Sequence, residues 1–520
     1  MTLRIRLLML TDRSLGVVLA LLLTGTSLAF GGRVWWASLA ISILALFVVL
    51  LGSFRVLLQG RMKLFKSPLM FLGILGVGLG AFQVLPLPGA LAARLSPASR
   101  SVYGVGFLPE SAKAIDDTVV LPETPSIRSP ISVDRPATLR WLSGAAACLA
   151  VFWAAAQYTD RLRHFQIIAG SIITAFFLNT SVAVVQLITR ARGLFGFIEP
   201  GLGPAWAPTG LDLLAAPGQS VLRVSGLVKA GHPTLALSVP EPDFYIGTQI
   251  GGPEAYLALG ALAMPLALGM TLQLLAPRGS REPLRVRLGQ SSEGSLVVLL
   301  YGTLLVSALI IGILAGPWLS LPFGLALLIA GLPVIRSTGL GWTALGLTLC
   351  SVLMLSAGVA LGQVWAQSNL FPSPVSPRSI SDSFRVWTDA LPITRIFPWF
   401  GTGLGTFGTI YPAFKSQDAS SNTAMSSLLQ WWVEAGFLGI ALVGLAALWC
   451  LIKLPRAIGR VGTADRSLVF GLIAAAAGFS LYSAAQWTVE LTSVALAAGA
   501  LCGIGNRWLS GGTDLFVERG

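Results

Sequence analysis

The chain has 520 residues, of which 54% are hydrophobic and only 11% charged, with a mean hydropathy of +0.77. A soluble domain carries about 25% charged residues, so this composition excludes a water-soluble globule such as a cytosolic enzyme. The formal charge of +13 would suggest a nucleic-acid partner for a soluble protein, but in a membrane protein such an excess reflects topology. We therefore expect no nucleic acid as a partner.

Membrane spans are the elements to expect, and each needs about 20 mostly apolar residues. The sequence contains twelve such stretches, at 15–31, 34–53, 67–90, 139–157, 165–188, 254–276, 295–315, 317–334, 339–363, 430–452, 467–487 and 489–506. Two pairs of stretches are separated only by Gly316 and by Thr488. The first stretch follows a basic segment, as in a signal peptide, but a second stretch comes at once without a clear cleavage site. We expect it to be an anchor.

The distribution of basic residues sets the orientation of these spans. With the N-terminus inside, the whole excess of 13 positive charges lies on the cytoplasmic connections, and the charges of the outer segments cancel. The opposite orientation would place that excess outside the cell. We therefore predict an all-α polytopic membrane protein of about twelve transmembrane helices, with both termini inside and long extracytoplasmic loops that carry short helices.

Three outer segments are long in this arrangement, namely 93–138, 189–253 and 364–429. They separate four membrane parts, which are residues 1–92 (helices 1–3), 139–188 (helices 4–5), 254–363 (helices 6–9) and 430–520 (helices 10–12 and a cytoplasmic tail). Loops of this length are usually functional or disordered. Their many aromatic residues argue against simple disorder, so we expect the working surface outside the membrane.

Local patterns predict some structure inside these outer segments. The second segment has a Gly/Pro-rich half at 201–218 and strand-like runs around 221–228. The third reads as an amphipathic helix from Ser379 to Leu391, which Pro392 should stop. One face of this helix is apolar and consists of Ile380, Phe384, Trp387 and Leu391. Trp387 would suit the membrane interface.

The segment Gly403-Leu-Gly-Thr-Phe-Gly408 matches the GxGxxG pattern of dinucleotide sites. It has no βαβ context and lies in an outer segment, so the composition predicts a tight turn rather than a cofactor site. The four cysteines lie in apolar runs, and the two histidines, His164 and His232, are predicted on opposite sides of the membrane. We therefore expect neither a cofactor nor a metal site.

Three arginines of the outer segments, Arg223, Arg385 and Arg395, are candidates for binding a phosphate group. A guanidinium group presents a rigid pair of donors that matches two phosphate oxygens, so these residues suit a lipid pyrophosphate at the membrane surface. The alternative is that they pair with Asp382, with Asp389 or with lipid phosphates.

Two carboxylates, Glu434 and Glu490, lie at or within predicted spans. A charge there is costly, which by itself marks a candidate functional residue. The alternative role for either residue is to cap the end of a span or to pair with an arginine.

A recognisable pattern spans residues 385–439. It contains Arg385-Val-Trp387, then Pro398-Trp-Phe-Gly401-Thr-Gly403-Leu-Gly405-Thr-Phe407, and then Leu429-Gln430-Trp-Trp-Val-Glu434-Ala-Gly436-Phe-Leu-Gly439. This pattern resembles the O-antigen ligase and polymerase family of integral membrane glycosyltransferases. In that family an Arg and a Trp precede a Gly-rich turn, and a polar segment opens the next span. Residues 247–268 resemble the family more weakly.

The resemblance implies a multi-pass protein of the bacterial cytoplasmic (inner) membrane that acts in cell-envelope polysaccharide or lipopolysaccharide biosynthesis. Its donor would be a glycan on a polyprenyl (undecaprenyl) pyrophosphate, and its acceptor a hydroxyl of a glycan, lipid or protein outside the membrane. Arg385 and Arg223, with Arg395 in reserve, would stabilise the pyrophosphate leaving group without a metal. The motif residues expected to shape the site are Gly401, Gly403, Gly405, Phe407, Gln430 and Gly436.

The chain departs from the family where the family has a histidine, because Met425 stands there and Ser426 follows it. A thioether cannot take a proton from an acceptor hydroxyl. We therefore predict Glu434 as the catalytic base, with Glu254 and His232 as alternatives, or a loss of catalysis.

Two functions of other classes stay open. A polysaccharide transporter or flippase commonly has two similar halves and a binding site at the membrane midplane, and the sequence shows neither a repeat nor charged residues at mid-depth. A catalytically inactive scaffold of envelope polysaccharide assembly is suggested by Met425.

Overall fold

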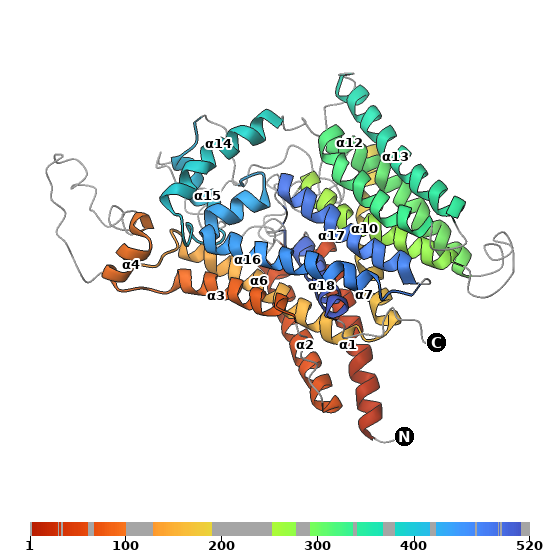
Figure 1. Cartoon of the computed structure of the whole chain (residues 1–520), viewed down its shortest axis with the longest axis horizontal. Helices are drawn as coiled ribbons and strands as arrows, with labels where there is room; N and C mark the ends of the chain where they lie inside the picture. The colour runs from red at the N-terminus through yellow and green to blue at the C-terminus, as the bar shows by residue number, and fades with distance from the viewer. Residues whose placement is uncertain are drawn as a thin grey trace, which may run out of the picture.

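The computed structural model describes residues 3–29, 31–32, 35–60, 67–99, 128–189, 252–276, 292–335, 341–367, 380–416, 423–462, 465–486, 488 and 491–510. Within these residues the structure is helical, and the one β-type pairing is an isolated bridge between Leu87 and Ser129 (Figure 1). The helices are α1 (Leu3–Leu28), α2 (Trp35–Gln59), α3 (Leu69–Val84), α4 (Gly89–Leu95), α6 (Arg135–Tyr158), α7 (Leu162–Thr189), α10 (Gly252–Leu275), α12 (Ser292–Ile335), α13 (Gly341–Gln367), α14 (Ile380–Ile396), α15 (Phe407–Ile410), the 3-10 turn η3 (Tyr411–Ala413), α16 (Ser427–Ile458), α17 (Arg466–Ala485) and α18 (Thr492–Leu509).

Nine helices among the described residues are long and apolar enough to cross a membrane, which are α1, α2, α6, α7, α10, α12, α13, α16 and α17. The prediction of an all-α, multi-pass membrane protein is therefore confirmed. Helix α12 has 44 residues but is interrupted by non-helical backbone at Gly316, the residue between two of the predicted stretches. Helices α3 and α18 coincide with two further stretches, and α3 is apolar but has only 16 residues.

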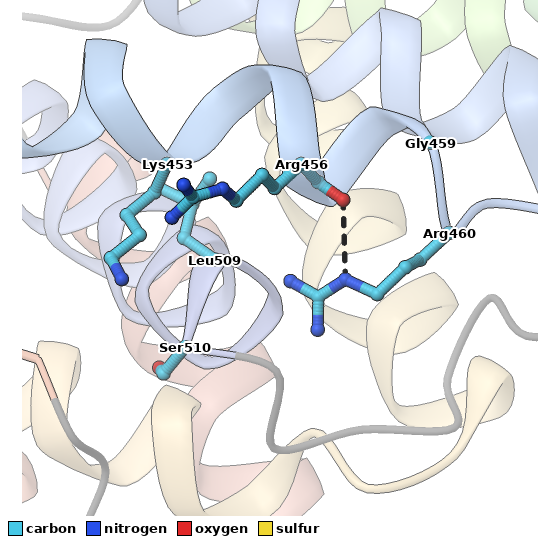
Figure 2. Close-up of a pocket in the computed structure, with 6 residues that line it drawn as sticks. All are labelled: Lys453, Arg456, Gly459, Arg460, Leu509 and Ser510. Carbon is cyan, nitrogen blue, oxygen red and sulfur yellow. Dashed lines mark hydrogen bonds between the residues drawn. The ribbon is translucent and has the colours of Figure 1, made fainter.

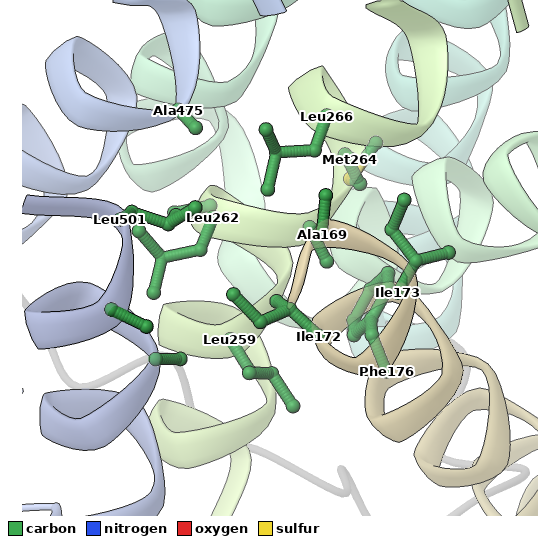
Figure 3. Close-up of a cluster of buried hydrophobic side chains, with 14 of the residues drawn as sticks. Ala169, Ile172, Ile173, Phe176, Leu259, Leu262, Met264, Leu266, Ala475 and Leu501 are labelled. Atoms are coloured by element: carbon green, nitrogen blue, oxygen red, sulfur yellow. The ribbon is translucent and has the colours of Figure 1, made fainter. Parts of the chain in front are cut away.

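Helix α10 forms the centre of the bundle. Its whole apolar window is buried, and it contacts α7, α12, α17 and α18. Figure 3 shows side chains of α10, including Leu259, Leu262 and Leu266, between those of α7, α17 and α18. Small residues permit the closest approach: a Cβ on Gly269 of α10 would lie 2.6 Å from the backbone oxygen of Ser467 in α17. Membrane helices commonly pack through such positions, because backbones can then gain close van der Waals contact.

The outer surface of the bundle is apolar. Large hydrophobic side chains are more than half exposed on several helices, such as Val298 (67%) on α12, Leu353 (65%) on α13 and Leu451 (66%) on α16. An apolar surface of this extent is a liability in water but is the expected surface for a helix bundle in lipid. The exposed residues therefore indicate a bilayer environment.

The bundle has two chemically different ends, and α6 runs from one to the other. Near its start, the backbone N–H of Val133 donates to the carbonyl of Thr402, which belongs to the Gly-rich segment. Near its end, the carbonyls of Ala156 and Gln157 accept hydrogen bonds from Arg507 of α18. We call the first the turn end and the second the basic end.

An ionic cluster of two buried basic side chains, Arg55 and His164, and two partly exposed carboxylates joins α1, α2 and α7 at the basic end. Arg55 pairs with Asp12 at 2.9 Å and with Asp160 at 2.8 Å, and His164 contacts the same two carboxylates at 2.9 and 2.6 Å. Burial alone would raise the pKa of the Asp160 carboxyl, but the hydrogen bond to His164 and the charge of Arg55 outweigh it. The pKa of Asp160 is consequently held well below its usual range.

Helix α14 differs from its prediction in length and in the face that it buries. It continues through Pro392 to Ile396. Its buried apolar residues are Val386, Ala390 and Ile393, whereas Phe384 and Leu391 of the predicted apolar face are exposed. A proline inside a helix costs about 3 kcal/mol, and burial of the apolar residues beyond it offsets that cost. The strand-like runs predicted around 221–228 lie outside the described residues.

Candidate functional site

The Gly-rich segment 398–407, which we call the glycine turn, folds as the tight turn that its composition predicts. Gly401, Gly403 and Gly405 all have positive φ angles, of 69°, 111° and 77°. L-residues with a side chain rarely adopt this backbone region, whereas glycine enters it freely. The alternating glycines thus let the chain reverse direction within a few residues.

The glycine turn docks against a break in α16 at Gly436, where φ is 64°. The N–H of Phe437 beyond the break donates to the Pro398 carbonyl at 2.8 Å. A second hydrogen bond runs from the turn to the helix, because the N–H of Thr402 donates to the Val433 carbonyl at 3.0 Å. A helix break leaves backbone donors and acceptors without helical partners, and the turn supplies those partners.

The two backbones lie in direct contact at this junction. A Cβ on Gly436 would lie 2.5 Å from the Trp399 carbonyl oxygen, and one on Gly401 would collide with the backbone of Glu434. Both glycines also have positive φ. The motif positions Gly401 and Gly436 are therefore explained by close packing of backbone on backbone.

The Glu434 side chain lies inside this junction and is only 1% exposed. Its Oε2 accepts from the N–H of Gly405 at 2.8 Å, and its Oε1 accepts from the N–H of Phe407 at 2.9 Å and from Gln430 Nε2 at 3.1 Å. A buried carboxylate is costly unless it is hydrogen-bonded in this way. The geometry favours a positioning role for Glu434, and its role as a base stays a prediction.

Gln83, in the last turn of α3, completes the junction and was not anticipated from the sequence. Its Nε2 donates to the carbonyls of Phe400 at 2.6 Å and Glu434 at 2.9 Å, and its Oε1 accepts from the N–H of Leu404 at 3.0 Å. The side chain is fully buried. The available signal was an isolated amide within an apolar predicted span, which is a position that often marks a functional or packing role.

The residues just before α6 hold the other side of the glycine turn. A Cβ on Gly403 would lie 2.5 Å from Ser132 Oγ, so the turn packs directly on that serine. Asp134 caps α6 by accepting from the N–H of Ala137, and its second oxygen accepts from the hydroxyl of Thr409 at 3.0 Å. Residues 128–134 and the described residues 398–409 therefore form one assembly.

Of the three candidate arginines, Arg385 and Arg395 lie on α14 and both side chains are exposed. Ten residues separate them, which is about 15 Å along a helix axis. The opposite face of α14 packs with Phe407 and Val433 in a small apolar cluster beside the turn. No ion pair among the described residues joins either arginine to Glu434, and Arg223 lies outside those residues.

Met425 is 9% exposed and belongs to the same apolar cluster. Its φ of 53° is unusual for a residue with a side chain. Ser426 then caps α16, because its Oγ accepts from the N–H of Leu429 at 3.3 Å. The position carries a packed thioether, so no acid–base group stands there.

Asp389 of α14 contacts the segment that follows the turn instead of a described arginine. Its Oδ2 accepts from the N–H and the hydroxyl of Ser416, both at 3.1 Å, and from the Tyr411 hydroxyl at 3.4 Å. Burial and the neighbouring Asp389 charge raise the pKa of Tyr411 to about 12. Tyr411 therefore stays protonated at neutral pH and donates to Asp389.

The other candidate acids and bases are spread over the chain. Glu254 lies in the first turn of α10, whereas His232 and Glu490 lie outside the described residues. Within the described ranges, no group of three or more His, Cys, Asp or Glu side chains is arranged to hold a metal ion.

Comparison of the chain with models of protein families, with curated proteins and with solved structures finds no significant match.

Proposed function

We propose that this chain is a membrane glycosyltransferase of the O-antigen ligase and polymerase type. It would transfer a glycan from a polyprenyl-pyrophosphate carrier to an acceptor hydroxyl on the outer face of the cytoplasmic membrane. The proposal includes twelve spans with both termini inside. It is supported by helices that overlap each of the twelve apolar stretches when α12 is divided at Gly316, and by the distribution of basic residues. In this arrangement the turn end is extracytoplasmic and the basic end is cytoplasmic.

The observation that carries the proposal is the display of Arg385 and Arg395 on α14 at the turn end. Buried hydrogen bonds of the glycine turn with Glu434 and Gln83 hold the C-terminal end of this helix against α3, α6 and α16. A site needs such a rigid support to present charged groups in a fixed geometry. The resemblance of residues 385–439 supplies the substrate class.

Glycan transfer requires positive charge near the pyrophosphate leaving group. When the bond between the sugar and the pyrophosphate breaks, negative charge develops on the leaving oxygen, and fixed guanidinium groups stabilise that charge. Arg385 is assigned to this role, Arg395 is the reserve, and Arg223 remains a candidate from the second outer segment. The acceptor hydroxyl loses its proton to a base, for which Glu434 and Glu254 are the described candidates.

The experiment compares Arg385→Ala, Arg395→Ala and Arg140→Ala in reconstituted membranes supplied with a lipid-linked glycan. Arg140 is an exposed arginine near the start of α6, so it controls for the loss of one positive charge at the same end. We expect Arg385→Ala to lower transfer at least a hundredfold, which corresponds to the loss of one strong transition-state contact. Full activity of Arg385→Ala, at unchanged expression, would remove this arginine from the mechanism.

The scaffold alternative draws support from the buried position of Met425 and from the hydrogen-bonded oxygens of Glu434. In this alternative the chain lacks a working acid–base group and holds other enzymes of polysaccharide assembly together without transferring glycans itself. Met425→His tests this directly: appearance of transfer in an otherwise inactive protein would favour a scaffold that has lost its base. Vesicle uptake of a labelled glycan without formation of a new glycoconjugate would instead indicate a transporter or flippase.

A further inference from the structure

A cavity of about 680 Å³ opens at the basic end of the bundle, where the C-terminal ends of α16 and α18 meet. Its lining consists of Lys453, Arg456, Gly459, Arg460, Leu509 and Ser510. Figure 2 shows the three basic side chains reaching from the end of α16 toward the end of α18. This cavity is remote in sequence and in the fold from the glycine turn.

The lining is strongly cationic. Lys453 and Arg456 are three residues apart on one side of α16, and Arg460 follows in the turn just beyond the end of that helix, where it lines the same cavity. None of the three forms an ion pair with a carboxylate in the described parts of the chain. Three positive charges around a cavity, with no described carboxylate paired to them, favour an anion, and guanidinium groups favour a phosphate.

One of these side chains is already oriented by the protein. Arg460 Nε donates to the Arg456 carbonyl at 3.2 Å, so part of this guanidinium group is committed to the helix end. Its two terminal nitrogens remain available for a ligand. The Ser510 hydroxyl lies on the opposite wall and adds a neutral polar group.

The surface next to the cavity is apolar and exposed. Leu445, Leu448 and Ile452 precede Arg456 at helical spacing on α16, and each is more than half exposed. This stripe belongs to the apolar outer surface that indicates a bilayer. A ligand that fits both features has a phosphate for the cavity and hydrocarbon chains for the stripe.

We propose that this cavity binds the phosphate headgroup of an anionic phospholipid, with the acyl chains of the lipid along Leu445, Leu448 and Ile452. Basic pockets at the end of a membrane helix bundle are suited to such headgroups. A free phosphate would use the same cations but would gain nothing from the apolar stripe. The proposal does not depend on glycan transfer.

The test measures lipid binding by the full chain with native mass spectrometry, using phosphatidylglycerol, phosphatidylcholine and inorganic phosphate as probes. We expect tighter binding of phosphatidylglycerol than of phosphatidylcholine. Each basic side chain near an anionic lipid contributes roughly fivefold in affinity. The triple variant K453Q/R456Q/R460Q should therefore bind phosphatidylglycerol about a hundredfold more weakly.

The matched control is R6Q/R13Q/R163Q, which removes three exposed arginines from the same end but outside the cavity. It should retain binding, and an equal loss in both triple variants would overturn the proposal in favour of general charge attraction. Competition by millimolar inorganic phosphate would instead assign the cavity to a free anion.

A second variant leaves all three cations in place. Ser510→Glu introduces a negative charge into the wall of the cavity and should lower phosphatidylglycerol binding at least fivefold while binding of phosphatidylcholine is unchanged. Unaltered phosphatidylglycerol binding by this variant would exclude the cavity as the headgroup site.

Discussion

Gln83 donates a hydrogen bond to the backbone carbonyl of Glu434 over a distance of 2.9 Å, although 351 positions separate the two residues in the chain. The same amide nitrogen also reaches the Phe400 carbonyl, and the amide oxygen accepts from Leu404. A single side chain of the third helix thus ties the glycine turn to the break in α16. The stability of this junction and the position of α14 therefore depend on the same hydrogen bonds.

Replacement of Gln83 by alanine is expected to destabilise the protein by roughly 2–6 kcal/mol, because the Phe400 carbonyl and the Leu404 N–H lose a buried partner at about 1–3 kcal/mol each. The Glu434 carbonyl keeps its hydrogen bond from the N–H of Gly403. The measurement is the free energy or midpoint of unfolding in detergent. Thr388→Ala, at an exposed position of α14 whose hydroxyl bonds only locally, is the control and should be neutral. Equal stability of the two variants would show that the amide is dispensable.

Alanine at Gly436 should be much more damaging than alanine at Gly444 of the same helix. Gly436 has a positive φ and faces the Trp399 carbonyl, whereas nothing lies within 4 Å of a Cβ on Gly444. We expect Gly436→Ala to cost more than about 2 kcal/mol and Gly444→Ala to be neutral or stabilising by up to about 1 kcal/mol. Gly316→Ala, with positive φ but open space, should fall between them. Thermal unfolding of the three variants would rank them, and any other order would contradict the packing argument.

Glu434→Gln separates a positioning role from proton transfer. Glutamine has one acceptor oxygen, so its amide nitrogen would face the N–H of Gly405 or Phe407. If Glu434 positions the turn, the variant loses about 1–3 kcal/mol of stability. Gln430→Ala, which removes a partner of the same carboxylate, should then also be destabilised. If Glu434 is the base, kcat for glycan transfer falls while unfolding is unchanged.

Stability should fall in acid because of Asp160. Its pKa is depressed in the folded protein, so its contribution is present above the pKa of about 3.9 that an unfolded Asp has and is lost as the pH falls below that value. Asp160→Asn should therefore be less stable than the native chain at pH 7, by about 1.5–3 kcal/mol for a charged hydrogen bond. The difference should shrink toward pH 3, and unfolding curves at several pH values would measure it. A pH-independent difference would mean that the carboxylate charge is not what stabilises the cluster.

Several local features could be derived from the sequence because they depend on neighbouring residues. The apolar stretches are helical, the interruption at Gly316 is where two stretches meet, and the alternating glycines make a tight turn. The end and orientation of α14 could not be derived in this way. Pro392 predicts a helix end from local sterics alone, but packing of Ile393 and Phe397 in the cluster beside the turn outweighs that preference.

The candidate site shows the same division. Arg385, Glu434 and the glycines were found by residue type and spacing, yet their spacing says nothing about which of them is buried. The contacts of Gln83, Ser132 and Asp134 with the turn join segments that are distant in the chain. No local pattern encodes such contacts, because they arise only when separate helices pack.

Composition by itself determined that this protein lies in a membrane and crosses it as α-helices, since an apolar stretch of about 20 residues has the length of a spanning helix and satisfies its backbone hydrogen bonds internally in that form. Tertiary structure decided which polar residues inside that bundle are structural. Glu434 is buried, and backbone N–H groups donate to both of its carboxylate oxygens. Arg385 and Arg395 are exposed, and three basic side chains surround a cavity at the opposite end of the bundle. The physical reason is that burial and partner choice depend on the packing of distant segments, whereas the tendency to enter lipid is a sum over residues.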